Sequence, residues 1–325
     1  MDFLKVLGLI SGIIGFWSFG DNMFPEQKDM YSNYKVFVGI DGTANPGDPG
    51  ECCLTDAGGD IYYSKVFNSY GLEIGHGGQF PKLKSGSDET ITMWQVLPQQ
   101  AATVELFAGK DAVCIAAIGA TLHDGTHWGW VGDWGKICGI DWYYSGIMQP
   151  QWDNNSPLCT WIDADHSKGL KAGGIAITWT GFTNTVLPVD GGVARCGTYF
   201  GAWDKEGGKS VINATADSKQ HQAANGDEST RRRRLNNDRR LVVSSLPAHS
   251  ADELCRHPTS RGPSFVSLAE GTHCNMETRE ILPLCADGLT TGCFDLEAET
   301  GVDRTSSFGR RSGVGSLNAS RVIYW

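Results

Sequence analysis

The sequence predicts a mainly β protein, in which an antiparallel β-sandwich-like N-terminal domain precedes a small disulfide-rich α+β C-terminal module. Short β-rich runs, separated by clusters of Gly, Pro, Asp and Asn, fill the first part of the chain without helical periodicity between them. The 42 glycines among 325 residues favour turns over long helices. Four cysteines then crowd into Cys255–Cys293, a segment too short to build a sufficient core alone.

Seven segments of the N-terminal domain have the composition of strands. Ala112–Ala120 is nearly all apolar, which is typical of a central strand buried on both faces. The predicted strands are Lys35–Ile40, Ile61–Phe67, Thr90–Leu97, Thr103–Phe107, Ala112–Ala120, Leu158–Ile162 and Ile175–Trp179.

The composition predicts four parts along the chain: a signal peptide or apolar segment over 1–20, the sandwich over 21–204, a polar linker over 205–240, and the cysteine-rich module over 241–325. Within the last part, Ser250 and Glu253 form a capping-box pattern. We therefore expect a short helix to begin there.

The N-terminal segment has the pattern of a secretory signal. Lys5 precedes the uncharged apolar run Val6–Phe19, which is shorter than the ~20 residues of a membrane span. Ser18 and Gly20 supply small residues for a cut before Asp21. The alternative is an uncleaved apolar helix that packs on the domain or contacts a membrane.

The ten cysteines indicate disulfides and an oxidising compartment. Their number is even, and no pair has the C-x₂-C spacing of a zinc or redox site. The alternative is a cytosolic protein with buried free thiols. Because six precede the linker and four follow it, we expect pairing within each module. The ten are Cys52, Cys53, Cys114, Cys138, Cys159, Cys196, Cys255, Cys274, Cys285 and Cys293.

A run of arginines in the polar linker predicts proteolytic maturation. A subtilisin-like protease of the secretory pathway needs an extended, unpacked backbone of this kind, and we expect cleavage after Arg234 or Arg240. The six basic residues are Arg231, Arg232, Arg233, Arg234, Arg239 and Arg240. The alternative is a solvated patch that binds anionic lipid or nucleic acid. However, the net charge is −10, and removing these six arginines leaves −16, so the body of the protein should repel nucleic acid.

Three Asn-x-Ser/Thr sequons, at Asn154, Asn213 and Asn318, are candidate glycosylation sites and agree with secretion. Asn213 lies in the polar linker, where a glycan has most room.

An aromatic segment allows two interpretations. Exposed rings could stack on sugars, whereas buried rings would form the core of the sandwich, and the second is the commoner use. With Asp133, Asp141 and Asp153, the segment could also supply the paired carboxylates of a glycoside hydrolase. The candidate stacking residues are Trp128, Trp130, Trp134, Trp142, Tyr143 and Tyr144.

One short loop is a candidate cation site. Asp163, Asp165 and Ser167 alternate oxygen donors as many Ca²⁺ loops do, but the glycine and glutamate of an EF-hand are missing. The alternative is an Asp-rich β-turn. The pair His123 and His127 brackets Gly125, which predicts a turn and not a metal-binding helix. No nucleophile or nucleotide motif is present in the sequence.

Scattered blocks resemble a group of uncharacterised secreted cysteine-rich proteins of filamentous ascomycete fungi. The blocks are Gly15–Phe24, Thr55–Asp60, Trp134–Cys138, Trp142–Ser145, Cys159–Asp163, Glu253–Cys255, Cys274–Thr278 and Gly292–Asp295. The resemblance implies a fungal, extracellular setting and no known catalytic residues.

These observations favour a secreted, non-enzymatic effector, toxin-like or self-assembling surface protein that acts on a cell-surface or cell-wall component. The alternatives are a glycan-binding protein that uses residues 128–161 and a glycoside hydrolase. Self-association and membrane contact through the apolar N-terminal segment also remain open, and Ca²⁺ is the one cofactor that the sequence suggests.

Overall fold

A computed structural model describes residues 24–40, 57–78, 80–147, 157–167, 169–182, 195–212, 240–286, 289–296, 300–302 and 321–324. The chain divides into two units. One comprises Met1–Asp41 and Leu54–Ala223, and the other comprises Gly42–Cys53 and Ala224–Trp325. We call them the N-terminal and C-terminal units and describe each by itself.

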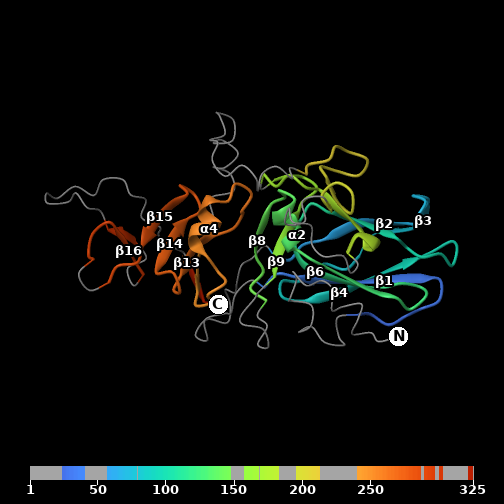
Figure 1. Ribbon diagram of the computed structural model, residues 1–325, viewed down its shortest axis with the longest axis horizontal. Helices are drawn as coiled ribbons and strands as arrows, with labels where there is room; N and C mark the ends of the chain where they lie inside the picture. Colours follow the sequence, from blue (N-terminus) through green and yellow to red (C-terminus); the bar gives the residue numbers. More distant parts are fainter. Residues whose placement is uncertain are drawn as a thin grey trace. The chain divides into compact units, whose positions relative to one another are not determined.

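The N-terminal unit is built almost entirely of strands (Figure 1). Its elements are β1 (Tyr31–Val38), β2 (Ile61–Phe67), β3 (Glu73–Gly78), β4 (Asp88–Trp94), β5 (Thr103–Ala108), β6 (Val113–Thr121), β7 (His127–Val131), α2 (Asp133–Ile137), β8 (Trp142–Tyr144), β9 (Leu158–Ile162), β10 (Gly174–Thr178), η3 (Trp179–Phe182) and β11 (Phe200–Trp203).

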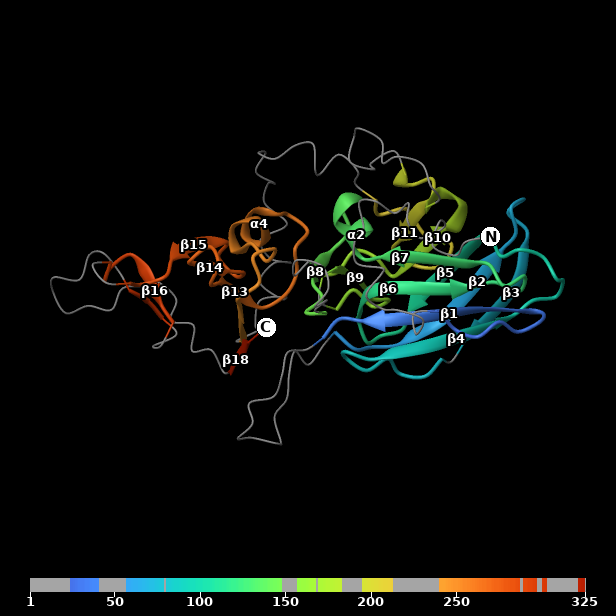
Figure 2. The same ribbon diagram turned by 60° about the horizontal axis from the view of Figure 1, so that its bottom comes forward.

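The strands form two antiparallel sheets arranged as a sandwich (Figure 2). One sheet has the order β4-β1-β6-β9-β8, with β7 also paired to β6, and the other has the order β11-β10-β5-β2-β3. Large rings from the two sheets meet between them. Trp130 of β7 stacks on Phe200 of β11 with centroids 5.5 Å apart, and Tyr34 of β1 lies 6.0 Å from Trp179, which follows β10. Burial of these rings is the main force that holds the sheets together.

The central strand β6 is buried along its whole length, as its apolar sequence predicts. It pairs with β1, β7 and β9, and the disulfide Cys114–Cys159 joins it to β9. A second disulfide, Cys138–Cys196, links the end of α2 to the segment before β11. The predicted sandwich class and all seven predicted strands are thus confirmed, with ends that differ by a few residues.

Four strands of this unit, β3, β7, β8 and β11, were not expected from the sequence. The segment Glu73–Gly78 contains three glycines, which weaken intrinsic strand preference. It is nevertheless a strand because β2 supplies its hydrogen-bonding partners from Tyr63 to Phe67. Tertiary pairing therefore overrides local propensity at this edge.

The described residues of the C-terminal unit form one sheet, one short helix and a pair of small strands. Its sheet has the order β15-β14-β13-β12-β18, in which β12 runs parallel to both neighbours. Its elements are β12 (Arg240–Ser244), α4 (Ala251–Arg256), β13 (Ser264–Ser267), β14 (Thr272–Asn275), β15 (Glu280–Pro283), β16 (Cys293–Asp295), β17 (Thr300–Val302) and β18 (Arg321–Tyr324). The predicted disulfide-rich α+β module is confirmed.

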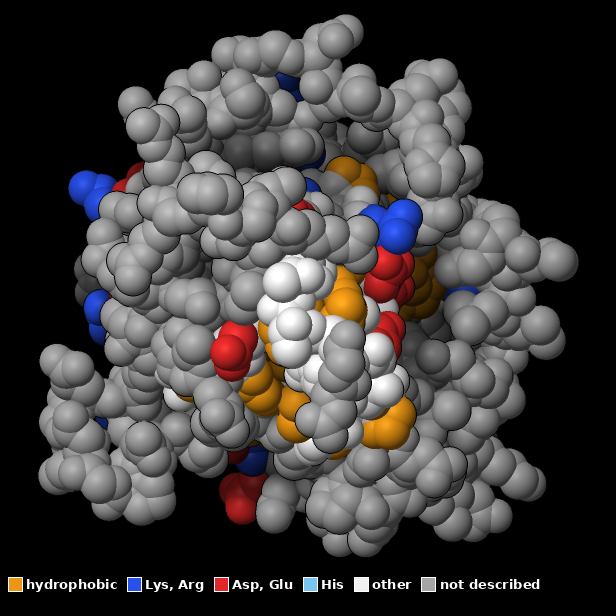
Figure 3. All heavy atoms as spheres, turned by 90° about the vertical axis from the view of Figure 1, so that its left-hand side faces the viewer, with side chains coloured by type: hydrophobic (Ala, Val, Ile, Leu, Met, Phe, Trp, Pro, Cys, Tyr) orange, Lys and Arg blue, Asp and Glu red, His pale blue; other side chains and the backbone are white. Residues whose placement is uncertain are grey.

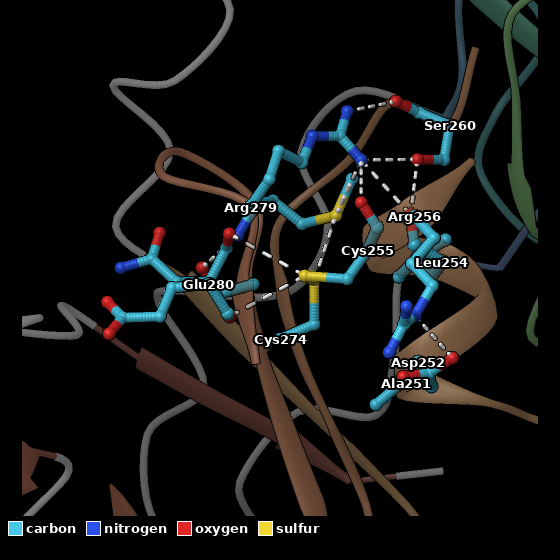
Figure 4. The surroundings of a disulfide bond; sticks show 12 residues. Ala251, Asp252, Leu254, Cys255, Arg256, Ser260, Cys274, Arg279 and Glu280 are labelled. Atoms are coloured by element: carbon cyan, nitrogen blue, oxygen red, sulfur yellow. Dashed lines mark hydrogen bonds and ion pairs between the residues drawn. A yellow bond between two sulfur atoms is a disulfide. The ribbon is translucent and has the colours of Figure 1, made fainter. Parts of the chain in front are cut away.

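The helix α4 begins where the sequence predicts. Ser250 is its N-cap, and the Ser250 side chain accepts a hydrogen bond from the backbone N–H of Glu253 at 3.0 Å. This bond satisfies one of the N–H groups that a helix start leaves without a partner. The disulfide Cys255–Cys274 then fastens α4 to β14 (Figure 4).

One hydrophobic cluster of the C-terminal unit gathers around Phe294. Leu241, Val243, Val266 and Phe294 are buried together, and the partly buried Leu282, Leu284, Leu296 and Val322 pack against them. Hydrophobic side chains of the described surface at this end are visible between uncharged and acidic ones (Figure 3). Among the described residues of this unit, a second disulfide joins Cys285 to Cys293, so two such bonds reinforce a short segment.

Candidate functional site

The aromatic segment lies in the interior of the N-terminal unit. Of the six rings considered for sugar stacking, only Trp128 is partly exposed, and the other five are buried: Trp130, Trp134, Trp142, Tyr143 and Tyr144. Four of these five residues lie on β7 or β8, and α2 carries Trp134. A ring without exposed surface cannot stack on a sugar, so the five rings act as core residues in this structure.

The carboxylates near this segment are engaged with the backbone. Oδ2 of Asp133 accepts a hydrogen bond from the N–H of Leu158 at 3.3 Å, and Oδ2 of Asp141 accepts one from the N–H of Lys171 at 2.8 Å. Burial raises the pKa of Asp133 to about 6, while the bond from Leu158 opposes this rise. Asp141 is fully buried, so its position suits a structural role. The third candidate, Asp153, lies outside the described residues.

The candidate calcium loop is a turn with internal hydrogen bonds. The N–H of Ser167 donates to Oδ1 of Asp165 at 2.8 Å, and the Ser167 hydroxyl lies 3.4 Å from Oδ2 of Asp163. Asp163 is buried, whereas Asp165 and Ser167 are exposed. In the part of the chain that the structure describes, no group of three or more His, Cys, Asp or Glu side chains is arranged to hold a metal ion. Calcium binding stays a prediction.

The pair His123 and His127 flanks a turn, as predicted. The N–H of Leu122 donates to the carbonyl of Thr126 at 2.9 Å. Gly125 has a φ of 77°, a backbone conformation that residues with a side chain rarely adopt. The turn connects β6 to β7. A hydrogen bond joins the side chains of His127 and Thr121 across this connection, with 3.0 Å between Nδ1 and Oγ1.

Several predicted sites fall on residues that the structure does not describe. These are the apolar segment 1–20, Cys52 and Cys53, the three sequons at Asn154, Asn213 and Asn318, and the arginines Arg231, Arg232, Arg233, Arg234 and Arg239. Arg240 is described and is the first residue of β12. Among the described residues, no helix is both long enough and apolar enough to cross a membrane.

One surface of the N-terminal unit was not anticipated. Five apolar side chains are strongly exposed on two neighbouring loops at the end where β1 begins, on the right in Figure 2. The exposed fractions are 94% for Tyr70, 59% for Leu72, 53% for Trp94, 61% for Val96 and 46% for Leu97. We call these five residues the apolar tip.

A buried polar network holds the two loops of the apolar tip together. Nδ2 of Asn68 donates to Oε1 of Gln99 at 2.7 Å, and Oδ1 of Asn68 accepts from the N–H groups of Tyr70 and Leu72, both at 3.0 Å. Beneath the second loop, Nε2 of Gln95 donates to the carbonyl of Gln99 at 2.6 Å. The loops therefore hold their shape without burying the apolar side chains.

The apolar tip has a signal in the sequence that is readable once the structure is known. Along β4 the residues alternate normally up to Met93, with Ile91 and Met93 buried and Thr92 exposed. From there the polarity inverts: Gln95 is buried, while Trp94 and Val96 face solvent. A strand end that hides an amide and exposes an indole departs from ordinary amphipathic alternation.

Comparison with known proteins gives no family. No family model and no curated protein matches the chain. Part of the chain is similar to crystal structures of delta413-417:GS LOX, each match covering 31% of this chain and 14% of that one. The complex with arachidonate matches at 13% identity with a TM-score of 0.24, and another at 15% with a TM-score of 0.22. Scores this low support no inference about the fold or function of this chain.

Proposed function

We propose that this chain is a secreted, non-enzymatic protein that acts on a cell surface or cell wall after cleavage in its arginine-rich linker. The observation that carries the proposal is the distribution of covalent bonds. Each of the four described disulfides joins two cysteines on the same side of the predicted linker 205–240, two of the bonds before it and two after it. Cleavage there would divide the chain and leave each described disulfide intact.

The disulfides also support an extracellular site of action. Thiols are kept reduced in the cytosol, whereas small secreted domains depend on such bonds. In the C-terminal unit, two such bonds fall within the short segment from Cys255 to Cys293.

The geometry of β12 favours one of the two predicted cleavage positions. A cut after Arg240 would fall within β12, immediately before Leu241, which is buried and pairs with Ser264 of β13. A processing protease needs an extended backbone that is not already paired in a sheet. We therefore propose cleavage after Arg234, which leaves β12 complete at the start of the C-terminal chain.

The described carboxylates and imidazoles support a non-enzymatic role. Asp133, Asp141 and Asp165 accept hydrogen bonds from backbone N–H groups, and His273 is buried in the sheet of the C-terminal unit. The hydrogen bonds of the three carboxylates suit a structural role, and His273 packs its ring on Phe294.

The experiment is an intact-mass measurement of the secreted protein, with and without reductant. We compare the wild type with a variant in which Arg231, Arg232, Arg233 and Arg234 are all replaced by Gln, and with Arg239→Gln/Arg240→Gln as the matched control. We expect the wild type and the control to yield a C-terminal chain that starts at Leu235, and the first variant to stay uncut. The two chains should separate on a non-reducing gel.

A wild-type product that is one intact chain would refute cleavage. A product that starts at Leu241 would refute the choice of Arg234. Two chains that stay linked without reductant would show that a disulfide crosses the cleavage site, and would refute pairing within each side of the linker.

A further inference from the structure

The apolar tip is an unusual surface for a protein whose body is acidic. Large apolar side chains scattered singly over a surface need no explanation, but several gathered on adjoining loops mark a contact site. Here the N–H of Val96 donates to the carbonyl of Ile74 at 2.8 Å, which places the loop after β4 against the start of β3. Strand β3 begins directly after Tyr70 and Leu72, so this bond places the second loop, with Trp94 and Val96, next to the first loop.

Both loops of the apolar tip are free of charge. Neither residues 68–72 nor residues 94–100 contain Asp, Glu, Lys or Arg, although the whole chain has 37 acidic residues. The next charged residue, Glu73, lies 3.6 Å from Nζ of Lys65 and 2.8 Å from Nδ1 of His76. Lys28 and Asp29, which precede β1, carry opposite charges.

We propose that the apolar tip is a lipid-docking site that inserts into the interface of a zwitterionic bilayer. Indole and phenol rings favour the depth of the lipid headgroups, and Leu and Val favour the acyl boundary below it. Insertion transfers apolar surface from water to lipid, and it removes no ionised side chain of the two loops from water. The proposal goes beyond the function proposed above, because it needs neither secretion nor cleavage.

The number of residues in the apolar tip favours lipid over a protein partner. A standard protein–protein interface uses about 20–30 residues on each side. Five apolar side chains on two loops at the end of a sandwich form a much smaller cap, which is enough for shallow insertion into a bilayer.

The polar network beneath the apolar tip fits this role. Asn68, Gln95 and Gln99 hold the loops in place, and Oε1 of Gln95 also accepts from the Ser32 hydroxyl at 2.5 Å. Loops that are already ordered lose little conformational entropy when they insert. The anchoring side chains are therefore presented to lipid before contact.

The test is co-flotation of the full-length protein with phosphatidylcholine vesicles, repeated with vesicles that also contain phosphatidylserine, at low and at high salt. The test variant is Tyr70→Ser/Leu72→Ser/Trp94→Ser. The matched control is Tyr62→Ser, which removes a 63% exposed tyrosine near the opposite end of β2. Val96→Ser/Leu97→Ser tests the second loop separately. Melting temperatures verify that each variant is folded.

We expect the wild type and Tyr62→Ser to bind phosphatidylcholine vesicles with no loss at high salt, since screening acts only on charge. Phosphatidylserine should not strengthen binding, because the net charge of the chain is −10. The triple variant should lower the partition coefficient by roughly 100-fold, and the double variant by about tenfold.

Three results would overturn the proposal. The first is a wild type that binds no vesicle. The second is binding that needs anionic lipid, or binding that the triple variant leaves unchanged. Either result would assign the contact to another part of the chain. The third is a wild type that dimerises through the apolar tip and ignores vesicles, which would make this surface an interface between two copies.

Discussion

Nδ2 of Asn68 donates a hydrogen bond to Oε1 of Gln99 across 2.7 Å and so joins two loops that are 31 residues apart in sequence. The same side chain closes its own turn by accepting from the N–H groups of Tyr70 and Leu72. One amide thus orders both loops of the apolar tip.

The replacement Asn68→Ala should destabilise the N-terminal unit. It removes three hydrogen bonds between partly buried groups, so we expect a loss of about 1–3 kcal/mol in the free energy of unfolding. Urea denaturation measures this loss. The adjacent exposed Ser69→Ala is the control and should change the free energy by less than about 0.5 kcal/mol. Equal effects of the two substitutions would show that the network does not hold the loops.

Arg279 holds the C-terminal end of α4. Its Nη1 lies 2.6 Å from Oγ of Ser260 and 3.0 Å from the carbonyl of Leu254, and its Nη2 lies 2.8 Å from the carbonyl of Ser260 (Figure 4). Carbonyls at a helix end lack intrahelical partners, and a guanidinium group satisfies several of them at once.

The substitution Arg279→Ala should therefore cost about 2–3 kcal/mol of stability. Arginine and alanine have a similar conformational cost at the φ of 61° found at this position. The change in stability therefore reports the loss of the Arg279 side chain. Arg256→Ala is the matched control, because Arg256 pairs with Asp252 on an exposed surface and should contribute only about 0–1 kcal/mol. Thermal unfolding compares the two. A larger loss for Arg256→Ala would contradict the assignment.

His273 and His249 should make the C-terminal unit sensitive to acid. Both are buried, and burial lowers the pKa of each to about 4. His273 also stacks on Phe294 with ring centroids 3.8 Å apart. Because the unfolded chain binds protons first, stability is complete above about pH 6.5 and falls as the pH drops toward 4.

Between about pH 7.5 and 5, each histidine should cost the folded state about 2 kcal/mol. We expect His273→Phe, which keeps a ring against Phe294, to halve the combined loss of the two histidines in denaturant titrations. The control His76→Gln removes an exposed histidine and leaves both buried histidines in place. A wild type whose stability does not vary over this range would refute the prediction.

Chelation tests the loop that contains Asp163, Asp165 and Ser167. A Ca²⁺ ion bound only to the folded state would raise the melting temperature in proportion to its occupancy. Because the backbone and hydroxyl of Ser167 already engage both aspartates, we expect excess chelator to leave the melting temperature unchanged. A lower melting temperature that added Ca²⁺ restores would establish the site, and Asp165→Asn should then abolish that response.

Local sequence patterns were sufficient for the elements whose stabilising contacts are near in the chain. The strand Ile61–Phe67 has the predicted bounds because β-branched and aromatic residues make up most of it. The helix after Ser250 begins as predicted because its cap lies three residues from the N–H that it satisfies. The disulfide class also followed from the number and spacing of the cysteines, since no metal-site spacing competes with it.

Long-range contacts decided the rest. The edge strand Glu73–Gly78 exists because β2 pairs with it, which a glycine-rich sequence does not reveal. The aromatic segment lies inside because two sheets close over it, as Trp130 shows by stacking on Phe200. The apolar tip is exposed because a buried amide network occupies the space beneath its loops. Residue spacing carries the period of a strand, but which face meets solvent depends on the sheets and loops that pack against it.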